Sequence, residues 1–336
     1  MTGLVGIRQE GYPFATGGTC QQDRRLPVRA VGTLAMPIAV QSKEKPVRLK
    51  RRPATDPADR VVLITGGSSG IGLAAALHAA ECGNRVALLA RNSDRLDVAA
   101  AQCRDRGAAE VMVLEADVAD AASVDTSVQQ LLTTWGKIDL IIQSAGVAGY
   151  GLFTDVPVAV FDRIIETNVL GTANVVRSAL PSMRARNQGT IIMVGSIIGY
   201  IATPSMTAYT TSKWAIRGLL RTLQVENRDR PGVHICYLAP AGVDTPIYRL
   251  AANYSDRDGR PPPPVLTAQR VAAAAFQLAD RPRRTAQVGS MNLLILAGFN
   301  AMPAVYDRLV SPLFRAFASR PSSAPTGHPG NAFDSS

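Results

Sequence analysis

The stretch Val61–Gly72 constrains the fold of this chain more than any other. It reads VVLITGGSSGIG, so an apolar, β-branched run stops at a glycine-rich turn and an alanine-rich segment follows at once. A helix N-terminus presents free N–H groups and the positive end of its dipole, and glycines let an anion approach the backbone. The order therefore predicts a strand, a tight turn and a helix that bind a pyrophosphate. The spacing is Gly66-x-x-x-Gly70-x-Gly72, not the usual G-x-G-x-x-G.

Strand-like and helix-like segments alternate through the rest of the chain. The expected strands are residues 61–65, 85–90, 111–116, 138–143, 190–194 and 233–238. The expected helices are residues 71–82, 94–106 (with Ser93 as N-cap), 121–135, 158–184, 208–227 and 267–279. Alternation of this kind implies right-handed crossovers between parallel strands. We therefore predict an α/β fold over residues 58–298, a single doubly wound Rossmann-fold domain whose mostly parallel seven-stranded sheet has helices on both faces.

The segments on either side of this domain differ in composition. Residues 1–57 are basic and are expected to be a disordered extension. In residues 299–320 apolar side chains fall on one helical face, which predicts an amphipathic helical segment. Residues 321–336 are rich in Pro, Ser and Gly, and we expect a disordered tail there.

Composition narrows the classes of function. The net charge is +10, but no aromatic side chains interleave the basic run before the domain, so we expect no nucleic-acid partner. Four scattered cysteines and three histidines without ligand spacing predict neither a metal site nor a disulfide framework. No apolar run is long enough to span a membrane as a helix. We expect a cytoplasmic protein, with peripheral membrane contact through residues 299–320 as an open alternative.

Two side chains at strand ends bear on the nucleotide. Dinucleotide folds place an acid at the end of the second strand to hold the ribose 2′-hydroxyl of NAD, but here that strand ends in Ala90-Arg91. A guanidinium suits a 2′-phosphate, so NADP(H) is favoured, while NAD(H) stays possible and an ordinary exposed arginine is the alternative. Asp117 could accept a hydrogen bond from an adenine amino group, or could simply cap the next helix.

A tyrosine and a lysine four residues apart begin the helix expected after the fifth strand. Tyr209 and Lys213 then share one helix face, and an ammonium near a phenol is expected to lower the pKa of the phenol. A tyrosine of that kind is a general acid or base at cellular pH. Ser196, at the end of the fifth strand, could donate a hydrogen bond to a carbonyl oxygen. The Tyr209–Lys213 spacing and a serine at a strand end are each common by chance. Their occurrence together after the phosphate loop in one chain is far less accidental.

These motifs together resemble the short-chain dehydrogenase/reductase family over about residues 60–296. The resemblance implies a coenzyme loop in Thr65–Gly72, an adenine-binding pair in Asp117-Val118, and an active-site tetrad of Asn168, Ser196, Tyr209 and Lys213. The coenzyme contacts that it implies, besides those of Tyr209 and Lys213, are Gly66, Ser68, Ser69, Gly70, Ile71, Gly72, Arg91, Asp117, Val118, Ser144, Ala145, Gly146, Val243 and Thr245.

The resemblance also implies a role for each member of the tetrad. Tyr209 would be the general acid or base at the substrate oxygen, and Ser196 would orient and polarise that oxygen. Lys213 would bind the nicotinamide ribose, and Asn168 would help hold a proton-relay water. The chain departs from the family pattern at Ser144, where an asparagine is usual, and at Ala241, where a glycine is usual; neither change removes a catalytic group.

The sequence therefore predicts an NADP(H)-dependent oxidoreductase that interconverts a hydrophobic ketone or aldehyde and its alcohol. The substrate class follows from mostly apolar or aromatic side chains in the expected pocket, namely Tyr150, Leu152, Phe153, Ile198, Tyr200, Met206, Ile247 and Tyr248. A membrane-associated reductase of lipid or steroid-like molecules is one alternative. An inactive Rossmann-fold coenzyme sensor or binding protein is another. We expect a homo-oligomer, either a dimer or a tetramer.

Overall fold

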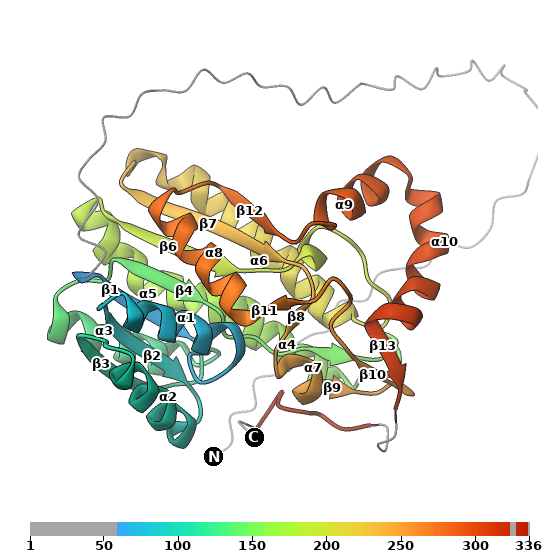
Figure 1. Ribbon diagram of the computed structural model, residues 1–336, viewed down its shortest axis with the longest axis horizontal. Coiled ribbons are helices and arrows are strands. Elements are labelled where there is room, and N and C mark those ends of the chain that lie inside the picture. Colours follow the sequence, from blue (N-terminus) through green and yellow to red (C-terminus); the bar gives the residue numbers. More distant parts are fainter. Residues whose placement is uncertain (1–58, 323–326, 335–336) are drawn as a thin grey trace, which may run out of the picture. The chain divides into compact units, whose positions relative to one another are not determined.

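Seven strands form the central sheet of the computed structural model, which describes residues 59–322 and 327–334 (Figure 1). Their bounds are β1 Val61–Thr65, β2 Arg85–Ala90, β3 Glu110–Glu115, β4 Leu140–Gln143, β6 Gly189–Val194, β7 Val233–Pro240 and β12 Thr285–Val288. The order is β12-β7-β6-β4-β1-β2-β3, and every neighbouring pair is parallel. The order reverses between β1 and β4, and in such sheets ligands bind at that point, outside the carboxyl ends of the strands.

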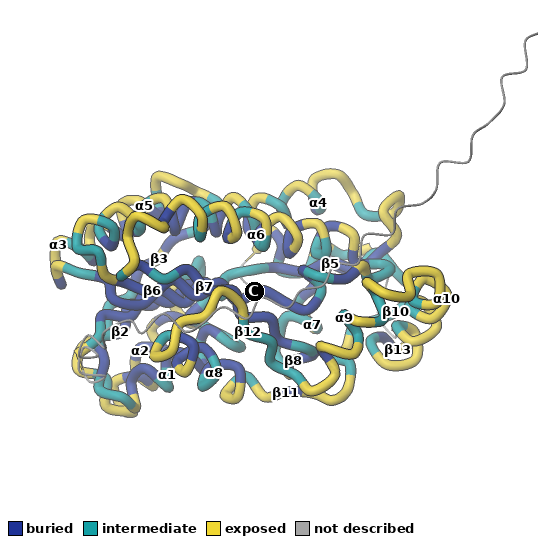
Figure 2. The backbone as a smooth tube through the Cα atoms, turned by 90° about the horizontal axis from the view of Figure 1, so that it is seen from above, coloured by how far each residue is buried: buried dark blue, intermediate teal, exposed yellow. Residues whose placement is uncertain are grey.

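Helices cover both faces of the sheet, as Figure 2 shows. One face carries α1 Gly70–Glu81, α2 Ser93–Asp105 and α8 Ala268–Asp280; the other carries α3 Ala121–Trp135, α5 Gly171–Arg186 and α6 Thr207–Glu226. Alternate residues of β1 enter the two hydrophobic clusters, Val62 and Ile64 on one side and Val61 and Leu63 on the other. A strand buried on both faces must be apolar throughout, which explains the unbroken apolar run. The predicted doubly wound α/β fold is confirmed.

Several boundaries differ from those expected. The N-cap of α2 is Asn92 rather than Ser93, because the Asn92 side-chain oxygen accepts the Arg95 N–H at 2.8 Å. The long helix expected over 158–184 is three consecutive segments: α4 Val158–Ile165, a π-helical turn Glu166–Leu170 and α5. The π-helical turn inserts its extra residue at the segment that carries Asn168, and such turns are frequent at functional sites.

Short elements lie beyond the carboxyl ends of the sheet strands. Two parallel pairs join β5 Gly149–Tyr150 to β9 Ala252–Asn253, and β8 Val243–Asp244 to β11 Leu266–Thr267. A single helical turn, α7 Ile247–Leu250, lies between β8 and β9 in the chain. These pairs fix the two loops that surround the candidate site.

A helical pair follows β12. It consists of α9 Asn292–Ala301 and α10 Pro303–Leu313, and a π-helical turn Phe314–Ala318 leads to β13 Ser319–Pro321, which pairs antiparallel with β10 Arg257–Gly259 (Figure 1). The helical segment thus begins at residue 292, earlier than the expected 299. Within the described part of the chain, every helix is too short or too polar to cross a bilayer.

The two terminal segments that we expected to be disordered have different outcomes. The expected basic extension, residues 1–57, lies outside the described residues. Residues 327–334, which we expected to be disordered, instead pack against the domain. The Asn253 N–H donates to the His328 carbonyl at 2.9 Å, and the Asn331 N–H donates to the Leu250 carbonyl at 2.8 Å. Polar composition alone predicted disorder, but main-chain hydrogen bonds to the domain order this segment.

Candidate coenzyme groove and active site

The glycine-rich turn after β1 is folded back on itself. Gly66 and Gly70 have φ angles of +64° and +53°, in the region that side chains disfavour. A Cβ on Gly72 would lie 2.1 Å from the Gly66 carbonyl oxygen, so only glycine fits there. The α1 helix begins at Gly70 and directs its free N–H groups toward this turn. The turn is therefore a cradle of main-chain donors that no side chain fills.

A groove runs from this turn across the carboxyl ends of the neighbouring strands. Its lining includes eight of the residues expected to contact coenzyme: Gly66, Ser68, Ser69, Arg91, Asp117, Val118, Ala145 and Gly146. Besides Tyr209 and Lys213, six expected contacts do not line it. Of these, Ile71 packs against the core, Val243 is buried in β8, and Thr245 lies beside Gly70. Ser144 follows β4, and Gly70 and Gly72 lie in the first turn of α1.

The departure from the family pattern at Ser144 has a structural replacement. The main-chain N–H groups of Ser144 and Ala145 each donate to the Thr65 Oγ1 at 3.1 Å. The same hydroxyl donates to the Gln143 Oε1 at 2.6 Å. Thr65, at the end of β1, therefore fixes the turn after β4 without an asparagine side chain.

Asp117 lies in the groove with an unforeseen partner. Its carboxylate is paired with the guanidinium of Arg163 on α4, and it also accepts the Ala119 N–H at 2.9 Å. The alternative that Asp117 caps the next helix is wrong, because the N-cap of α3 is Asp120, whose side chain accepts the Ala122 and Ser123 N–H groups. Arg163 is remote in sequence, and no local pattern connects it with the end of β3. One oxygen is held by Arg163 and the other by the main chain, which orients the carboxylate.

Arg91 also lies in the groove, where the sequence places it. Its guanidinium donates to four carbonyl oxygens of the C-terminal segment: Asn331 at 2.8 Å, and Ala332, Phe333 and Asp334 at 3.2 Å each. Partial burial lowers the pKa of Arg91, while the nearby Asp117 opposes that shift. The Arg91 donors are therefore engaged by main chain, a role that its position after β2 does not suggest.

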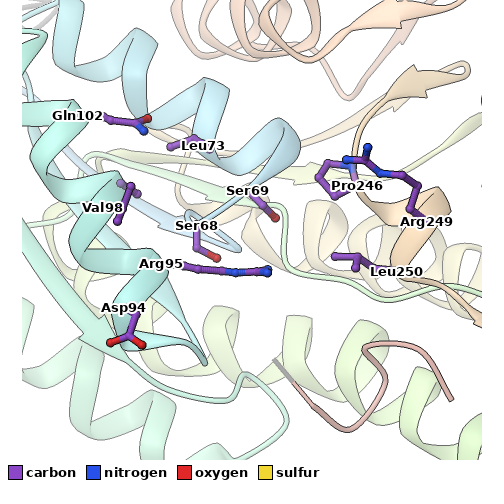
Figure 3. Close-up of a pocket in the computed structure, with 11 residues that line it drawn as sticks. Ser68, Ser69, Leu73, Asp94, Arg95, Val98, Gln102, Pro246, Arg249 and Leu250 are labelled. Atoms are coloured by element: carbon purple, nitrogen blue, oxygen red, sulfur yellow. The ribbon is translucent and has the colours of Figure 1, made fainter. Parts of the chain in front are cut away.

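A second arginine, Arg95, was not singled out by the sequence. It lines both the groove and an adjoining cavity of about 450 Å³, whose walls include Ser68, Ser69 and Leu250 (Figure 3). Figure 3 shows the exposed Arg95 side chain running past Ser68. The available signal was the Asn92 cap, which places Arg95 in the first turn of α2 beside the glycine turn.

Tyr209 and Lys213 share one face of α6, as predicted. The Lys213 Nζ lies 5.3 Å from the centroid of the Tyr209 ring and donates to the Val194 carbonyl at 3.2 Å. Burial lowers the pKa of Lys213 to about 8. Burial also raises the pKa of Tyr209, and the neighbouring Tyr248 and Tyr237 add to that rise. The expected fall in the Tyr209 pKa is absent, because the cost of desolvating a phenolate dominates.

Asn168 lies on the π-helical turn, and hydrogen bonds fix its side chain in the wall of the site. Its Oδ1 accepts the Val147 N–H at 2.8 Å, and its Nδ2 donates to the Val147 carbonyl and to the Ser212 Oγ, both at 2.9 Å. A Cβ on Gly146 would lie 3.1 Å from the Asn168 Oδ1 and 3.9 Å from the Lys213 Nζ. Gly146 thus lies between the groove and the Asn168 and Lys213 side chains.

Ser196 ends the turn after β6 and has a buried support. Its Oγ accepts the Ile198 N–H at 3.2 Å. Behind it, the hydroxyl of Tyr237 on β7 is hydrogen-bonded to the main chain of Ser196. A Cβ on Gly195 would lie 2.0 Å from the Tyr237 Cζ, so a glycine is required beside that ring. Tyr237 was not singled out from the sequence, because a tyrosine inside an apolar strand is usually core.

The surroundings of Tyr209 are apolar and aromatic. The cluster that holds the ring also contains Ala148, Tyr150, Ile198, Met206, Ile247, Tyr248, Ala251 and Phe314. Three expected pocket residues lie elsewhere: Leu152 and Phe153 are 60% and 65% exposed, and Tyr200 packs against Tyr237 and the Arg217 guanidinium. Among residues 59–322 and 327–334, no group of three or more His, Cys, Asp or Glu side chains gathers as a metal site would require.

The comparisons with known proteins point to one family. The short chain dehydrogenase family pattern matches residues 60–254. The chain is 33% identical to human "Dehydrogenase/reductase SDR family member 7" over 59% of each chain, and 36% identical to the Salmonella typhimurium "Oxidoreductase UcpA" over 66% of this chain and 82% of that one. It thus spans about three-fifths of the length of the human relative and of its mouse counterpart.

Solved structures agree with the sequence matches. An alcohol dehydrogenase from Thermococcus sibiricus, solved with 5-hydroxy-NADP, is 29% identical and has a TM-score of 0.60 over 68% of this chain and 95% of that one. Levodione reductase is 26% identical, with a TM-score of 0.60 over the same shares of the two chains.

Proposed function

The chain belongs to the short-chain dehydrogenase family, and we propose that it is an NADP(H)-dependent oxidoreductase that interconverts a hydrophobic ketone or aldehyde and its alcohol. One observation carries the proposal: a tyrosine and a buried lysine stand together beside the groove that begins at the glycine turn. Lys213 Nζ is 5.3 Å from the centroid of the Tyr209 ring. It is also 3.9 Å from the Cβ position of Gly146, a residue that lines the groove.

The residues that line the groove have the chemistry that a dinucleotide coenzyme requires. The unfilled glycine cradle and the N-terminus of α1 suit a pyrophosphate, and Asp117 offers a carboxylate oxygen to an adenine amine. When bound, the coenzyme supplies or accepts the hydride. Gly66, Ser68, Ser69, Gly70, Ile71, Gly72, Val118, Ser144, Ala145, Val243 and Thr245 are the remaining residues that we propose to hold it.

The protein's own contribution is to move one proton and orient one oxygen. Tyr209 donates its phenolic proton to the carbonyl oxygen in reduction and removes the hydroxyl proton in oxidation. Ser196 donates a hydrogen bond to the same oxygen and holds it in line with Tyr209. Lys213 compensates the negative charge that develops on the phenol. Asn168, fixed on both amide atoms, holds the main chain at Val147 beside these groups.

The apolar cluster around Tyr209 supports the proposed substrate class. Tyr150 and Met206 are buried, and Ile198, Ile247 and Tyr248 pack with them. Such walls favour an apolar carbonyl compound and leave the hydroxyl groups of a sugar without partners.

Two arginines beside the end of β2 support a preference for NADP(H). No carboxylate follows β2 to hold a free 2′-hydroxyl, since the strand ends in Ala90-Arg91. Arg91 contributes positive charge while its donors remain on the C-terminal segment. Arg95 has an exposed guanidinium beside Ser68, so we assign the direct contact with a 2′-phosphate to Arg95.

A substrate panel followed by NADPH absorbance at 340 nm tests the proposal. Apolar ketones and aldehydes should be reduced with a kcat/KM well above that for reducing sugars of similar size. Tight NADPH binding with no turnover of any carbonyl compound would instead identify an inactive coenzyme sensor. Sugars as the best substrates would contradict the proposed substrate class.

The α9–α10 pair favours a second candidate, a membrane-associated reductase of lipid-like substrates. Leu293 and Leu294 of α9 are 71% and 64% exposed, and Val305 and Leu309 of α10 are about half exposed. Arg308 and Arg315 lie on the same segment and suit anionic headgroups. Phe314, which follows α10, packs against the cluster around Tyr209, so the segment that carries this surface also contacts the candidate substrate site.

A further inference from the structure

The C-terminal segment 327–334 is built into the domain although it is far from the groove in sequence. Ala332 is fully buried. Gly330 has a φ of +56°, and a Cβ there would lie 2.3 Å from the Leu250 carbonyl oxygen. The Gly327 and His328 N–H groups both donate to the Asn253 carbonyl, at 2.9 and 3.1 Å. A close main-chain fit of this kind sets one position for the segment.

Two arginines from different elements hold the end of this segment. The Arg91 guanidinium donates to four of its carbonyls, those of residues 331–334. Arg163 donates through its Nε to the Ala332 carbonyl at 3.0 Å, while its Nη2 is paired with Asp117. The arginine that pairs with a groove carboxylate therefore also holds the segment. Neither set of contacts depends on the side chains of the segment, because all acceptors are main-chain oxygens.

Asn331 is the residue through which the segment reaches the groove. It lines the groove together with Asp117, Val118 and the glycine turn. Its Oδ1 is buried and has no hydrogen-bond partner among the described residues. A buried acceptor without a donor is costly, so its presence in a ligand groove points to a donor supplied by the ligand.

We propose that residues 327–334 complete the coenzyme site, with Arg91 and Arg163 anchoring a wall from which the Asn331 amide oxygen accepts the exocyclic amine of adenine. The inference rests on the proposed coenzyme. It makes Asn331 and Asp117 joint acceptors for one amine, which carries two hydrogens. Arg91 then acts as a positioning residue for the segment.

A nucleotide that lacks the amine provides the sharpest test. Kd is measured by fluorescence titration of the full-length protein with NADPH and with reduced nicotinamide hypoxanthine dinucleotide phosphate, in which a carbonyl replaces the amine. The wild type should prefer NADPH by about tenfold or more, because hydrogen bonds to the amine are lost and two acceptors face an acceptor. Asn331→Ala should weaken NADPH binding about three- to tenfold and reduce the preference by a similar factor.

Two further variants distinguish the effect of the segment's main-chain position from the effect of its side chains. Phe333→Ala is the matched control, because the Phe333 side chain is 46% exposed and only its carbonyl contacts Arg91; it should bind both nucleotides as the wild type does. Gly330→Ala should displace the segment and weaken NADPH binding at least as much as Asn331→Ala. Thermal unfolding shows whether each variant is folded.

Three outcomes would overturn the inference. Tighter NADPH binding by Gly330→Ala would show that the segment obstructs the groove. An unchanged preference for the amine in Asn331→Ala would show that Asn331 does not contact it. If Phe333→Ala weakened NADPH binding as much as Asn331→Ala does, the loss of binding would reflect general destabilisation of the segment. Failure of the wild type to bind NADPH at all would instead reject the proposed coenzyme.

Discussion

The Tyr237 hydroxyl bridges both main-chain polar groups of Ser196. It donates to the Ser196 carbonyl and accepts the Ser196 N–H, each at 3.2 Å. The ring is fully buried on β7, and burial raises the pKa of this phenol, so the hydroxyl keeps its proton. The position of the serine proposed to orient the substrate is thus set by a side chain on the neighbouring strand.

Tyr237→Phe should therefore impair turnover, although the Tyr237 side chain does not contact the substrate. We expect the free energy of unfolding to fall by about 1–3 kcal/mol, because two buried main-chain groups lose their partner. We expect kcat to fall about tenfold, with Kd for NADPH unchanged, because the effect acts through Ser196. Urea unfolding and steady-state kinetics measure both. Tyr254→Phe removes a hydroxyl from a partly buried ring elsewhere and is the control; an equal loss of kcat in that variant would contradict the prediction.

Tyr209→Phe should separate binding from chemistry. The substitution keeps the ring in its apolar cluster and removes the proton that the mechanism transfers. We expect kcat to fall by about 10²–10⁴, the usual contribution of a general acid or base, and Kd for NADPH to change less than twofold. Full activity in this variant would reject the mechanism while leaving the glycine turn as a coenzyme site.

Gly70→Val should have the opposite effect and abolish NADPH binding, because Gly70 has a φ of +53°.

Lys213 should make stability depend on pH in a defined window. Its pKa is lowered by burial from 10.5 to about 8. Between these values the unfolded chain binds a proton that the folded chain does not, so the free energy of unfolding rises with pH. Below pH 8 both states are protonated, and the burial penalty, roughly 3 kcal/mol, is fully present. Lys213→Met should therefore be more stable than the wild type at pH 7, by an amount that shrinks toward pH 10. A difference that stays constant across urea titrations at pH 7, 8.5 and 10 would contradict this.

Arg95→Ala should test the coenzyme preference. If Arg95 contacts the 2′-phosphate, its loss should raise Kd for NADPH about tenfold and leave Kd for NADH unchanged, since NADH lacks that group. Arg104→Ala removes an equal charge from the exposed last turn of the same helix and is the control. Equal weakening toward both coenzymes would assign Arg95 to the pyrophosphate instead.

The sequence predicted six of the seven strands of the sheet and eight of the residues that line the groove. Parallel strands buried on both faces read as short apolar runs, so β1, β2 and β7 were found within one or two residues of their bounds. The seventh strand, Thr285–Val288, was not located, because its residues are polar and partly exposed at the edge of the sheet. The more apolar run Leu293–Leu296, which follows it in the chain, belongs to α9 and not to the sheet.

Contacts between distant segments could not be predicted from the sequence. Arg163 with Asp117, Tyr237 with Ser196, and Arg91 with residues 331–334 each join elements whose proximity only the fold establishes. The predicted fall in the Tyr209 pKa was wrong for a related reason. A four-residue spacing places Lys213 near the ring, but it does not reveal how deeply both side chains are buried.

The exposed α9–α10 pair leads to a prediction about lipid surfaces. Two adjacent leucines that are 71% and 64% exposed would each gain about 1.5–3 kcal/mol on burial, and arginines on α10 and the following turn would favour anionic lipid. The protein should therefore co-sediment with vesicles containing anionic phospholipid and less with neutral ones. Leu293→Gln with Leu294→Gln should lower the partition coefficient at least tenfold, because both anchors are lost.

The control for that experiment is an equally exposed apolar residue elsewhere. Val158, at the start of α4, is 76% exposed, and Val158→Gln should leave vesicle binding unchanged. Light scattering without lipid decides whether the same leucines join two copies of the chain. A dimer that the double leucine variant dissociates, together with equal vesicle binding by all three proteins, would assign this surface to self-association, because the leucines would then be covered by protein rather than by lipid.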